Sequence, residues 1–318
     1  MRKSALILPV ACLVAVACLV AVSPVLAQPP FEDGTWHVRG DDGQIVHVLP
    51  GPAAAEAFAH RFGTQPPPER SNGLSVFTAS YGTIPGLLSD HGGAVVSNAG
   101  YMPIFYNAAT ASALQSGIDN FLNNFSNSNP GMQIITQYSK SGNAISATLT
   151  HVADLVDNLS APNRISDSGI RSYLTGLFNG GRIVPATNVI YGVYLPSGTT
   201  STNGSSRSCT SYCGYHSSFT YNNKTILYAV LPYLTCSGCS LAGKSVVDME
   251  TIVTSHEIRE AITDPVNAWW ESTSGYEDDD KCAWHNLYQQ TAGGAWVQPE
   301  YNNQLGSWST TARGCVTP

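Results

Sequence analysis

The chain has 318 residues and a formal net charge of −7 at pH 7, and only 12% of its residues are charged. Ordinary soluble domains carry roughly 25% charged residues. The acidic balance and the lack of a basic patch argue against nucleic acid as a partner, and the length fits one large domain or two smaller ones. A surface built mostly from uncharged polar side chains suits a protein that works outside the cell.

The first residues have the features of a secretory signal. A basic start is followed by the apolar run Ala5 to Val22, and small residues precede Ala27. We therefore expect residues 1–27 to be a signal peptide that is cut after Ala27. A retained membrane anchor and a lipoprotein cut before Cys18 are the alternatives. No later apolar run is long enough to cross a membrane, so we expect a secreted, extracellular protein that is not bound to a membrane.

The cysteines that follow the signal all lie in the C-terminal half of the chain. An even number of cysteines in an exported protein indicates disulfides, here three. Their pairing cannot be chosen from sequence. Two close pairs also have the spacing of a metal knuckle, but export favours oxidation. The cysteines are Cys209, Cys213, Cys236, Cys239, Cys282 and Cys315.

Residues 28–72 are expected to form a leader apart from the main domain. The runs at 35–38 and 45–48 predict a small β-hairpin, and residues 52–62 predict a short helix. A proline-rich stretch at 65–70 predicts a linker. In an exported hydrolase, such a leader is a removable pro-segment or an accessory element; a disordered tether is the remaining alternative.

Residues 73–318 are expected to form the main domain. Apolar, β-branched runs predict strands, and apolar residues at spacings of three and four predict helices. Their alternation indicates an α/β or α+β fold with a single central mixed sheet and flanking helices. A Ser/Thr/Asn/Gly-rich stretch at 197–208 predicts a long loop. The predicted strands are 95–96, 102–106, 132–138, 145–151, 189–195 and 226–233, and the predicted helices are 111–125 and 167–178.

A third helix carries the most informative pattern in the chain. Met249, Ile252, Val253, His256 and Glu260 recur at spacings of three and four, so they form one stripe on a helix. The stripe begins with apolar residues and should therefore face a core. It ends with a histidine and a carboxylate where more hydrophobic residues would be expected.

A carboxylate on a core-facing stripe is costly unless its charge is compensated. His256, Glu257 and Glu260 form a His-Glu-x-x-Glu motif, which differs from the His-Glu-x-x-His zinc helix in its last residue. We expect His256 and Glu260 to bind a metal and Glu257 to act as general base. The alternatives are a structural polar network, with Glu260 paired to Arg259 or Arg313, and a helix on the surface.

A catalytic zinc needs three protein ligands and one open position. The acidic run from Glu277 to Asp280 follows the helix, and either of these two residues could supply the third ligand, with Cys282 holding the run near the helix. If it supplies no third ligand, such a run is a solvated loop or a weak calcium site. His216 is a further candidate ligand or a structural histidine. Zinc is the expected metal, and calcium or manganese are alternatives because the carboxylates make a harder donor set.

Several of these segments occur together in one order. Cys213–His216, Tyr228–Pro232, Cys236–Cys239 and Ser255–Pro265 are followed by further cysteine-containing segments. The set resembles the phosphate-induced protein family, whose plant members are called EXORDIUM, over roughly Val95 to the C-terminus. The family pattern Glu-Ile-Gly-Asp-x-Cys has two further acids in this chain in place of Ile-Gly. The resemblance implies a secreted, cell-wall-associated protein linked with growth, and it implies no particular reaction.

Two functions fit these observations. The first is a secreted metal-dependent hydrolase, a zincin-like peptidase that acts as a monomer on a peptide or cell-wall substrate. The alternative is a non-catalytic, EXORDIUM-like extracellular or cell-wall-associated protein, in which the same helix forms a structural polar core or a structural metal site.

Overall fold

The structure is a computed structural model of the whole chain. It describes residues 36–40, 42–61, 87–128, 130–272, 275–303 and 314–317. The predicted signal peptide at 1–27, the linker at 65–70, the boundary between residues 72 and 73, and Arg313 lie outside the described residues.

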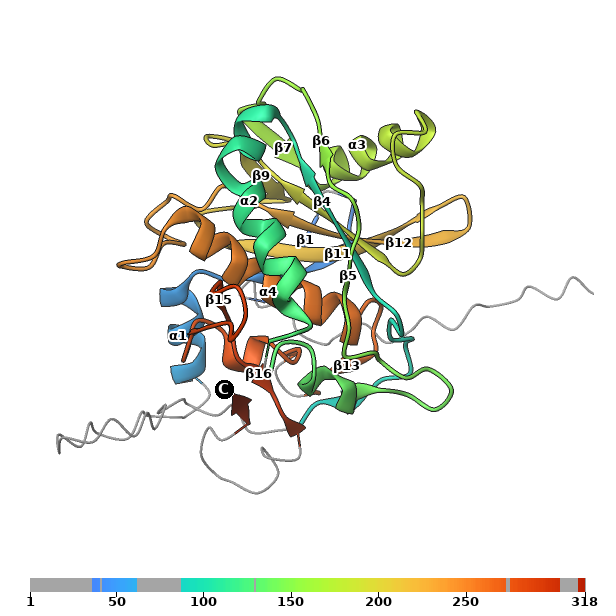
Figure 1. Cartoon of the computed structure of the whole chain (residues 1–318), viewed down its shortest axis with the longest axis vertical. Coiled ribbons are helices and arrows are strands. Elements are labelled where there is room, and N and C mark those ends of the chain that lie inside the picture. The colour runs from blue at the N-terminus through green and yellow to red at the C-terminus, as the bar shows by residue number, and fades with distance from the viewer. Residues whose placement is uncertain are drawn as a thin grey trace, which may run out of the picture.

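A mixed sheet of eight strands lies at the centre of the molecule (Figure 1). Its strands are β1 (His37–Arg39), β2 (Ile45–Leu49), β4 (Gly100–Phe105), β5 (Thr150–His151), β6 (Leu155–Val156), β8 (Val189–Tyr194), β11 (Gly214–Tyr221) and β12 (Lys224–Leu231). The order is β1-β2-β11-β12-β8-β4-β5, and β6 also pairs with β4. Strands β4, β8 and β12 are parallel, whereas β11 runs antiparallel to β12. The predicted α/β fold with a central mixed sheet is confirmed.

Four helices accompany the sheet in the described part of the chain. The predicted helices at 111–125 and 167–178 are confirmed as α2 (Ala108–Phe125) and α3 (Asp167–Asn179), together with α1 (Pro52–Arg61) and α4 (Val246–Thr263). Each long helix begins at a polar cap. Ser166 caps α3 by accepting a hydrogen bond from the backbone of Gly169. Ser245 and Asp248 form a reciprocal capping box at the start of α4.

The two faces of the sheet bury two separate cores. Ile190 and Tyr194 of β8 pack with α2 and α4, whereas Tyr191 and Val193 pack with α3 on the opposite face. This alternation follows from the two-residue period of a strand. Figure 1 shows α2 and α4 side by side, and α4 packs against β11 and β12. Any polar residue on that face of β11 therefore points at α4.

Some predicted strands are wrong. Residues 132–138 form a 3₁₀ helix, η1 (Ile134–Tyr138), rather than a strand. Gly131 turns the chain with a φ of 54°, and the spacing of three between Ile135 and Tyr138 places both in the core. Val95 and Val96 are buried without sheet pairing.

The predicted long loop at 197–208 is also wrong in part. It contains β9 (Thr200–Asn203) and β10 (Ser206–Arg207), and β7 (Arg164–Ser166) joins them in a small sheet. Gly204, with a φ of 54°, provides the tight turn between β9 and β10. The remaining short elements are β3 (Ser89–Asp90), β13 (Trp269–Trp270), η2 (Asp280–Cys282), β14 (Tyr288–Gln289), β15 (Trp296–Val297), β16 (Glu300–Tyr301) and β17 (Cys315–Val316).

The hairpin predicted in the leader forms, but it is not separate from the main domain. Strand β2 pairs antiparallel with β11 and so extends the central sheet. Val46 and Val48 are buried in the core on the α3 side, and Trp36 and Leu49 are buried in the core on the α4 side. The alternating side chains of the hairpin complete both cores.

The three expected disulfides are confirmed, and they link Cys209–Cys236, Cys213–Cys239 and Cys282–Cys315. The knuckle alternative is therefore wrong, because every sulfur that it needs is in a disulfide. Three disulfides indicate an oxidising environment. Within the described ranges, the helices are too short or too polar to cross a membrane.

A pair of glycine substitutions tests the packing of the sheet. A Cβ on Gly192 in β8 would lie 1.9 Å from the Oη of buried Tyr101. We expect Gly192→Ala to lower the free energy of unfolding by about 1–3 kcal/mol through overpacking. Gly176 lies inside α3, and a methyl group added there would meet no atom within 4 Å, so Gly176→Ala should raise it by about 0.5–1 kcal/mol. Urea unfolding measures both, and equal effects would contradict the packing described.

Candidate metal centre

Helix α4 carries the candidate residues into the interior. The predicted stripe does face the core, and His256 and Glu260 are 0% and 2% exposed. The rest of the helix from Met249 to Thr263 is buried as well, because α2, β15 and the sheet surround it. The alternative of a surface helix is therefore wrong. Glu257, expected to be the general base, is also fully buried.

A first group of possible ligands consists of His256, Glu260 and Asp280. The Nε2 of His256 lies 2.8 Å from Oε2 of Glu260 and 3.7 Å from Oδ1 of Asp280. The backbone N–H of Asp280 donates to Oε1 of Glu260 over 3.0 Å. One ligand atom from each residue lies within 4.8 Å of the others, so the three could hold a metal ion. Of the two acids considered for the third ligand, Asp280 is the one in this group.

A second group shares Glu260 with the first. The Nδ1 of His216, on β11, lies 3.3 Å from Oε2 of Glu257 and 3.7 Å from Oε2 of Glu260. These three residues also satisfy the spacing of a metal site. His216 thus lies next to Glu257, the candidate general base, and Glu260 belongs to both groups of possible ligands.

Glu277 faces the other side of His216. Its Oε1 lies 2.7 Å from Nδ1 of His47, and its Oε2 lies 3.5 Å from Nε2 of His216. His47 is the cross-strand partner of His216, and His37 is the cross-strand partner of His47. The three histidines therefore form a row across β1, β2 and β11 on the face that points toward α4.

His37 and His47 were not among the predicted site residues, because the hairpin that carries them was expected to belong to a separate leader. A signal was present: in each strand of the hairpin the histidine alternates with valines at Val38, Val46 and Val48. Since the valines are buried on the α3 side, the histidines must point to the opposite side.

Several polar atoms at the centre are buried without a hydrogen bond. In the described residues these include Oε1 of Glu257, Oδ2 of Asp278 and Oε1 of Gln298, whereas Nε2 of His256 and Oε1 of Glu277 have the ion-pair contacts given above. Buried polar groups are almost always hydrogen-bonded, and leaving one unsatisfied costs about 1–3 kcal/mol. A bound cation would satisfy several of these atoms at once.

The pKa values of the histidines and carboxyls at the centre also favour a bound cation. Burial lowers the pKa of His216 and of His256 to about 3, so both imidazoles are neutral. Burial raises the carboxyl pKa values well above their ordinary range, and neighbouring carboxylates raise them further. Without a cation these acids hold protons, which a divalent ion would displace. The affected carboxyls belong to Glu257, Glu260, Glu277 and Asp280.

Gln298 holds His256 in one orientation. Its amide Nε2 donates to Nδ1 of His256 over 3.1 Å and to the backbone oxygen of Asp279 over 2.6 Å. A neutral imidazole that accepts at Nδ1 carries its proton on Nε2. That proton points toward Glu260, so a metal at Nε2 would have to replace it.

The two central acids of the acidic run fix it to α4. Arg259 donates from Nε to Asp279 over 2.9 Å and lies 3.3 Å from Glu300, and Asp278 accepts from Thr263 over 2.9 Å. The predicted alternative of an Arg259 pair with Glu260 is therefore wrong. These contacts give Asp278 and Asp279 a structural role, and they leave the first and last acids of the run to face the centre.

The centre is closed to solvent. A cavity of about 620 Å³ opens beside Pro265 and Val266, beyond the C-terminal end of α4, and its lining includes no residue of the centre. A substrate can therefore reach His256 only if a covering element moves.

Comparisons with protein-family models, with curated proteins and with solved structures found no match. The resemblance to the phosphate-induced protein family stays a prediction, and the function is inferred from the site.

Glu260→Gln should remove one bound metal ion per chain, because Glu260 belongs to both groups. The matched control is Glu250→Gln, another fully buried carboxyl on α4 that accepts from the backbone N–H of Leu234 and lies outside both groups. Purified proteins are equilibrated with Zn²⁺, dialysed and assayed for metal. The affinity should rise from pH 6 to pH 8, because binding displaces protons. Equal metal content in the two variants would argue against the centre.

Proposed function

We propose that the chain is a secreted metal-dependent hydrolase, a zincin-like peptidase. The observation that carries the proposal is a buried helix that presents His256 and Glu260 to Asp280, with Glu257 between them. Two of the possible ligands and the base lie within about one turn of α4, and Asp280 reaches His256 from η2. Disulfides and the signal-like start of the chain support secretion.

In this proposal each residue has a defined task. His256, Glu260 and Asp280 would hold a zinc ion, which would polarise a carbonyl and make a bound water a stronger acid. Glu257 accepts the proton of the attacking water. Its Oε1 accepts no hydrogen bond and is therefore available for that proton, and burial together with the neighbouring Glu260 raises the pKa of the carboxyl.

His216 positions the base. Its Nδ1 lies 3.3 Å from Oε2 of Glu257, so a proton on Nδ1 is donated to that oxygen and leaves Oε1 available. The neutral state of the ring, with a pKa of about 3, prevents a permanent ion pair that would weaken Glu257 as a base.

The sheet suggests an extended peptide as substrate. Among the strands that follow residue 87, β11 is the outermost next to α4, and its outer edge runs past His216. Extended peptides bind by adding a strand to such an edge. In this structure β2 takes that place, and its His47 reaches Glu277. We therefore assign residues 28–72 the role of a pro-segment that occupies the substrate edge.

A second function is favoured by one contact. The hydrogen bond from Gln298 to Nδ1 of His256 directs a proton toward Glu260, as a structural polar core without metal requires. The chain would then be a non-catalytic extracellular protein of EXORDIUM type. Metal analysis and activity together separate the two: metal without turnover would favour a structural site.

Glu257→Gln should lower the rate of peptide hydrolysis by about 10²–10⁴-fold, the usual contribution of a general base. Its metal content should stay at the wild-type level, because the first ligand group is unchanged. Activity is followed on a library of quenched fluorescent peptides, with Glu250→Gln as the matched control. Full activity in the Glu257 variant would end the proposed mechanism.

Release of the hairpin should increase activity. A specific protease site introduced at residues 65–70 allows the chain to be cut and the N-terminal piece to be removed. We expect hydrolysis to rise and a peptide of residues 36–61 to restore inhibition, more strongly than the same peptide with His47→Ala. Unchanged activity after removal, with the remaining domain folded by circular dichroism, would contradict the pro-segment role.

A further inference from the structure

Helix α2 carries a polar stripe away from the centre described above. Gln115, Asp119 and Asn123 follow one another at spacings of four, so they lie on one face of the helix. Each of them makes a contact with His151 or Asp154, which come from β5 and the segment that follows it. None of these residues belongs to the centre on α4.

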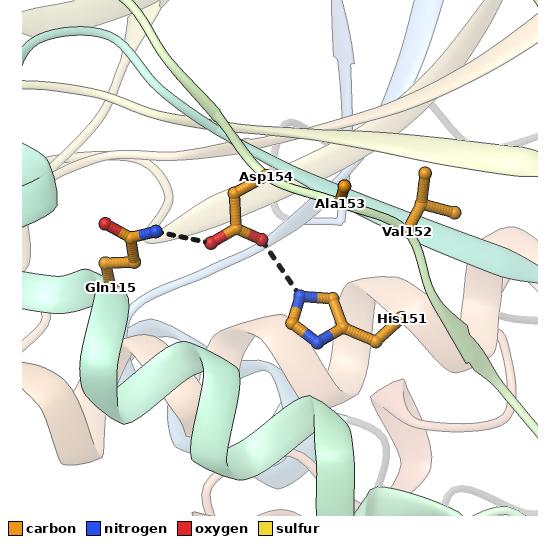
Figure 2. A pocket seen from close by; sticks show the side chains of 5 residues that line it. All are labelled: Gln115, His151, Val152, Ala153 and Asp154. Carbon is orange, nitrogen blue, oxygen red and sulfur yellow. Dashed lines mark hydrogen bonds and ion pairs between the residues drawn. The ribbon is translucent and has the colours of Figure 1, made fainter.

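Three of the five side chains bring ligand atoms together. The Nε2 of His151 lies 2.9 Å from Oδ1 of Asp154 and 3.7 Å from Oδ1 of Asp119. All three atoms lie within 4.8 Å of one another. Figure 2 shows the imidazole directed at the carboxylate of Asp154.

The other two side chains orient these ligands. The Oδ1 of Asn123 lies 2.9 Å from Nδ1 of His151, and an amide oxygen can only accept, so Nδ1 carries a proton and Nε2 faces the carboxylates. Gln115 donates to Oδ2 of Asp154 over 2.7 Å, on the side away from His151. Metal-binding histidines and carboxylates are held by such outer contacts. The Oδ1 of Asp119 is shielded from solvent and has no hydrogen bond.

A pocket of about 370 Å³ lies beside these ligands, and Gln115, His151 and Asp154 line it (Figure 2). It has room for the water molecules that would complete the coordination of an ion held by three protein atoms. An imidazole nitrogen with two carboxylates suits a transition metal better than calcium, which takes oxygen ligands.

We propose that Asp119, His151 and Asp154 bind a divalent transition-metal ion such as Zn²⁺ or Mn²⁺. The ion links α2 to β5 and so ties the helix to the edge of the sheet. The site shares no residue with the centre on α4, so the outcome at one does not decide the other.

The test compares His151→Gln and Asp154→Asn with wild type, and His91→Gln serves as control because His91 stacks on Trp270 outside both sites. Each protein is equilibrated with Zn²⁺, dialysed and assayed for metal. Both site variants should bind one ion fewer than wild type and the control. Combining His151→Gln with Glu260→Gln should remove a further ion if the centre on α4 also binds metal. Asn123→Ala should weaken binding at this site about 10–100-fold.

Wild-type metal content in both folded site variants would overturn the proposal and leave His151 as a structural contact of Asn123 and Asp154. Circular dichroism checks that the variants fold. If neither folds, wild type is titrated with Zn²⁺ and the ring signals of the histidines are followed by NMR. The site requires the signals of the ring hydrogen-bonded to Asn123 to shift, and their constancy would also overturn it.

Discussion

The structure depends on how a set of buried carboxyl groups is compensated. Glu257, Glu260, Glu277 and Asp280 lie within one small volume, and each is at most 6% exposed. Burial alone would make such a set too costly to keep ionised. Protons or a cation must therefore be present, and the neutral histidines beside the carboxyls offer nitrogen ligands for a cation. The buried carboxyl groups around α4 therefore require either bound protons or a bound cation.

On the same helix, Arg259 compensates the charge of two acids that have a structural role. Its guanidinium, fully buried, contacts Asp279 and Glu300 and fixes the acidic run against α4. Breaking a buried pair of this kind costs about 3–5 kcal/mol. Among the described residues, the chain thus supplies a permanent cation for one pair of acids, whereas the ion-pair partners of Glu257 and Glu260 are histidines. This difference separates the acids that fix the loop to α4 from the acids that belong to the possible metal-binding groups.

The sequence predicted those features that depend on local spacing. The stripe that ends in His256 and Glu260 needs only the period of a helix, and the same period predicted α2 and α3. Sequence could not decide between Glu277 and Asp280, because the choice depends on how Asp278 and Asp279 bind α4. It could not place His47 beside Glu277 either, since β2 and β11 are far apart in the chain. Pairing between strands that are far apart in the chain produces no periodic spacing of residues in the sequence.

A metal site and a structural polar core without metal differ in the position of one proton on His256. With Nε2 protonated, Gln298 donates to Nδ1 and to the backbone of Asp279, while its own Oε1 is left without a hydrogen bond. A metal at Nε2 moves the proton to Nδ1, and Gln298 must turn to offer Oε1. The turn costs the hydrogen bond to Asp279, about 1–3 kcal/mol, and satisfies Oε1 in return. Structural zinc sites gain on the order of 10–16 kcal/mol, so even a much weaker site would drive this rearrangement. The orientation of Gln298 is therefore no barrier to metal binding.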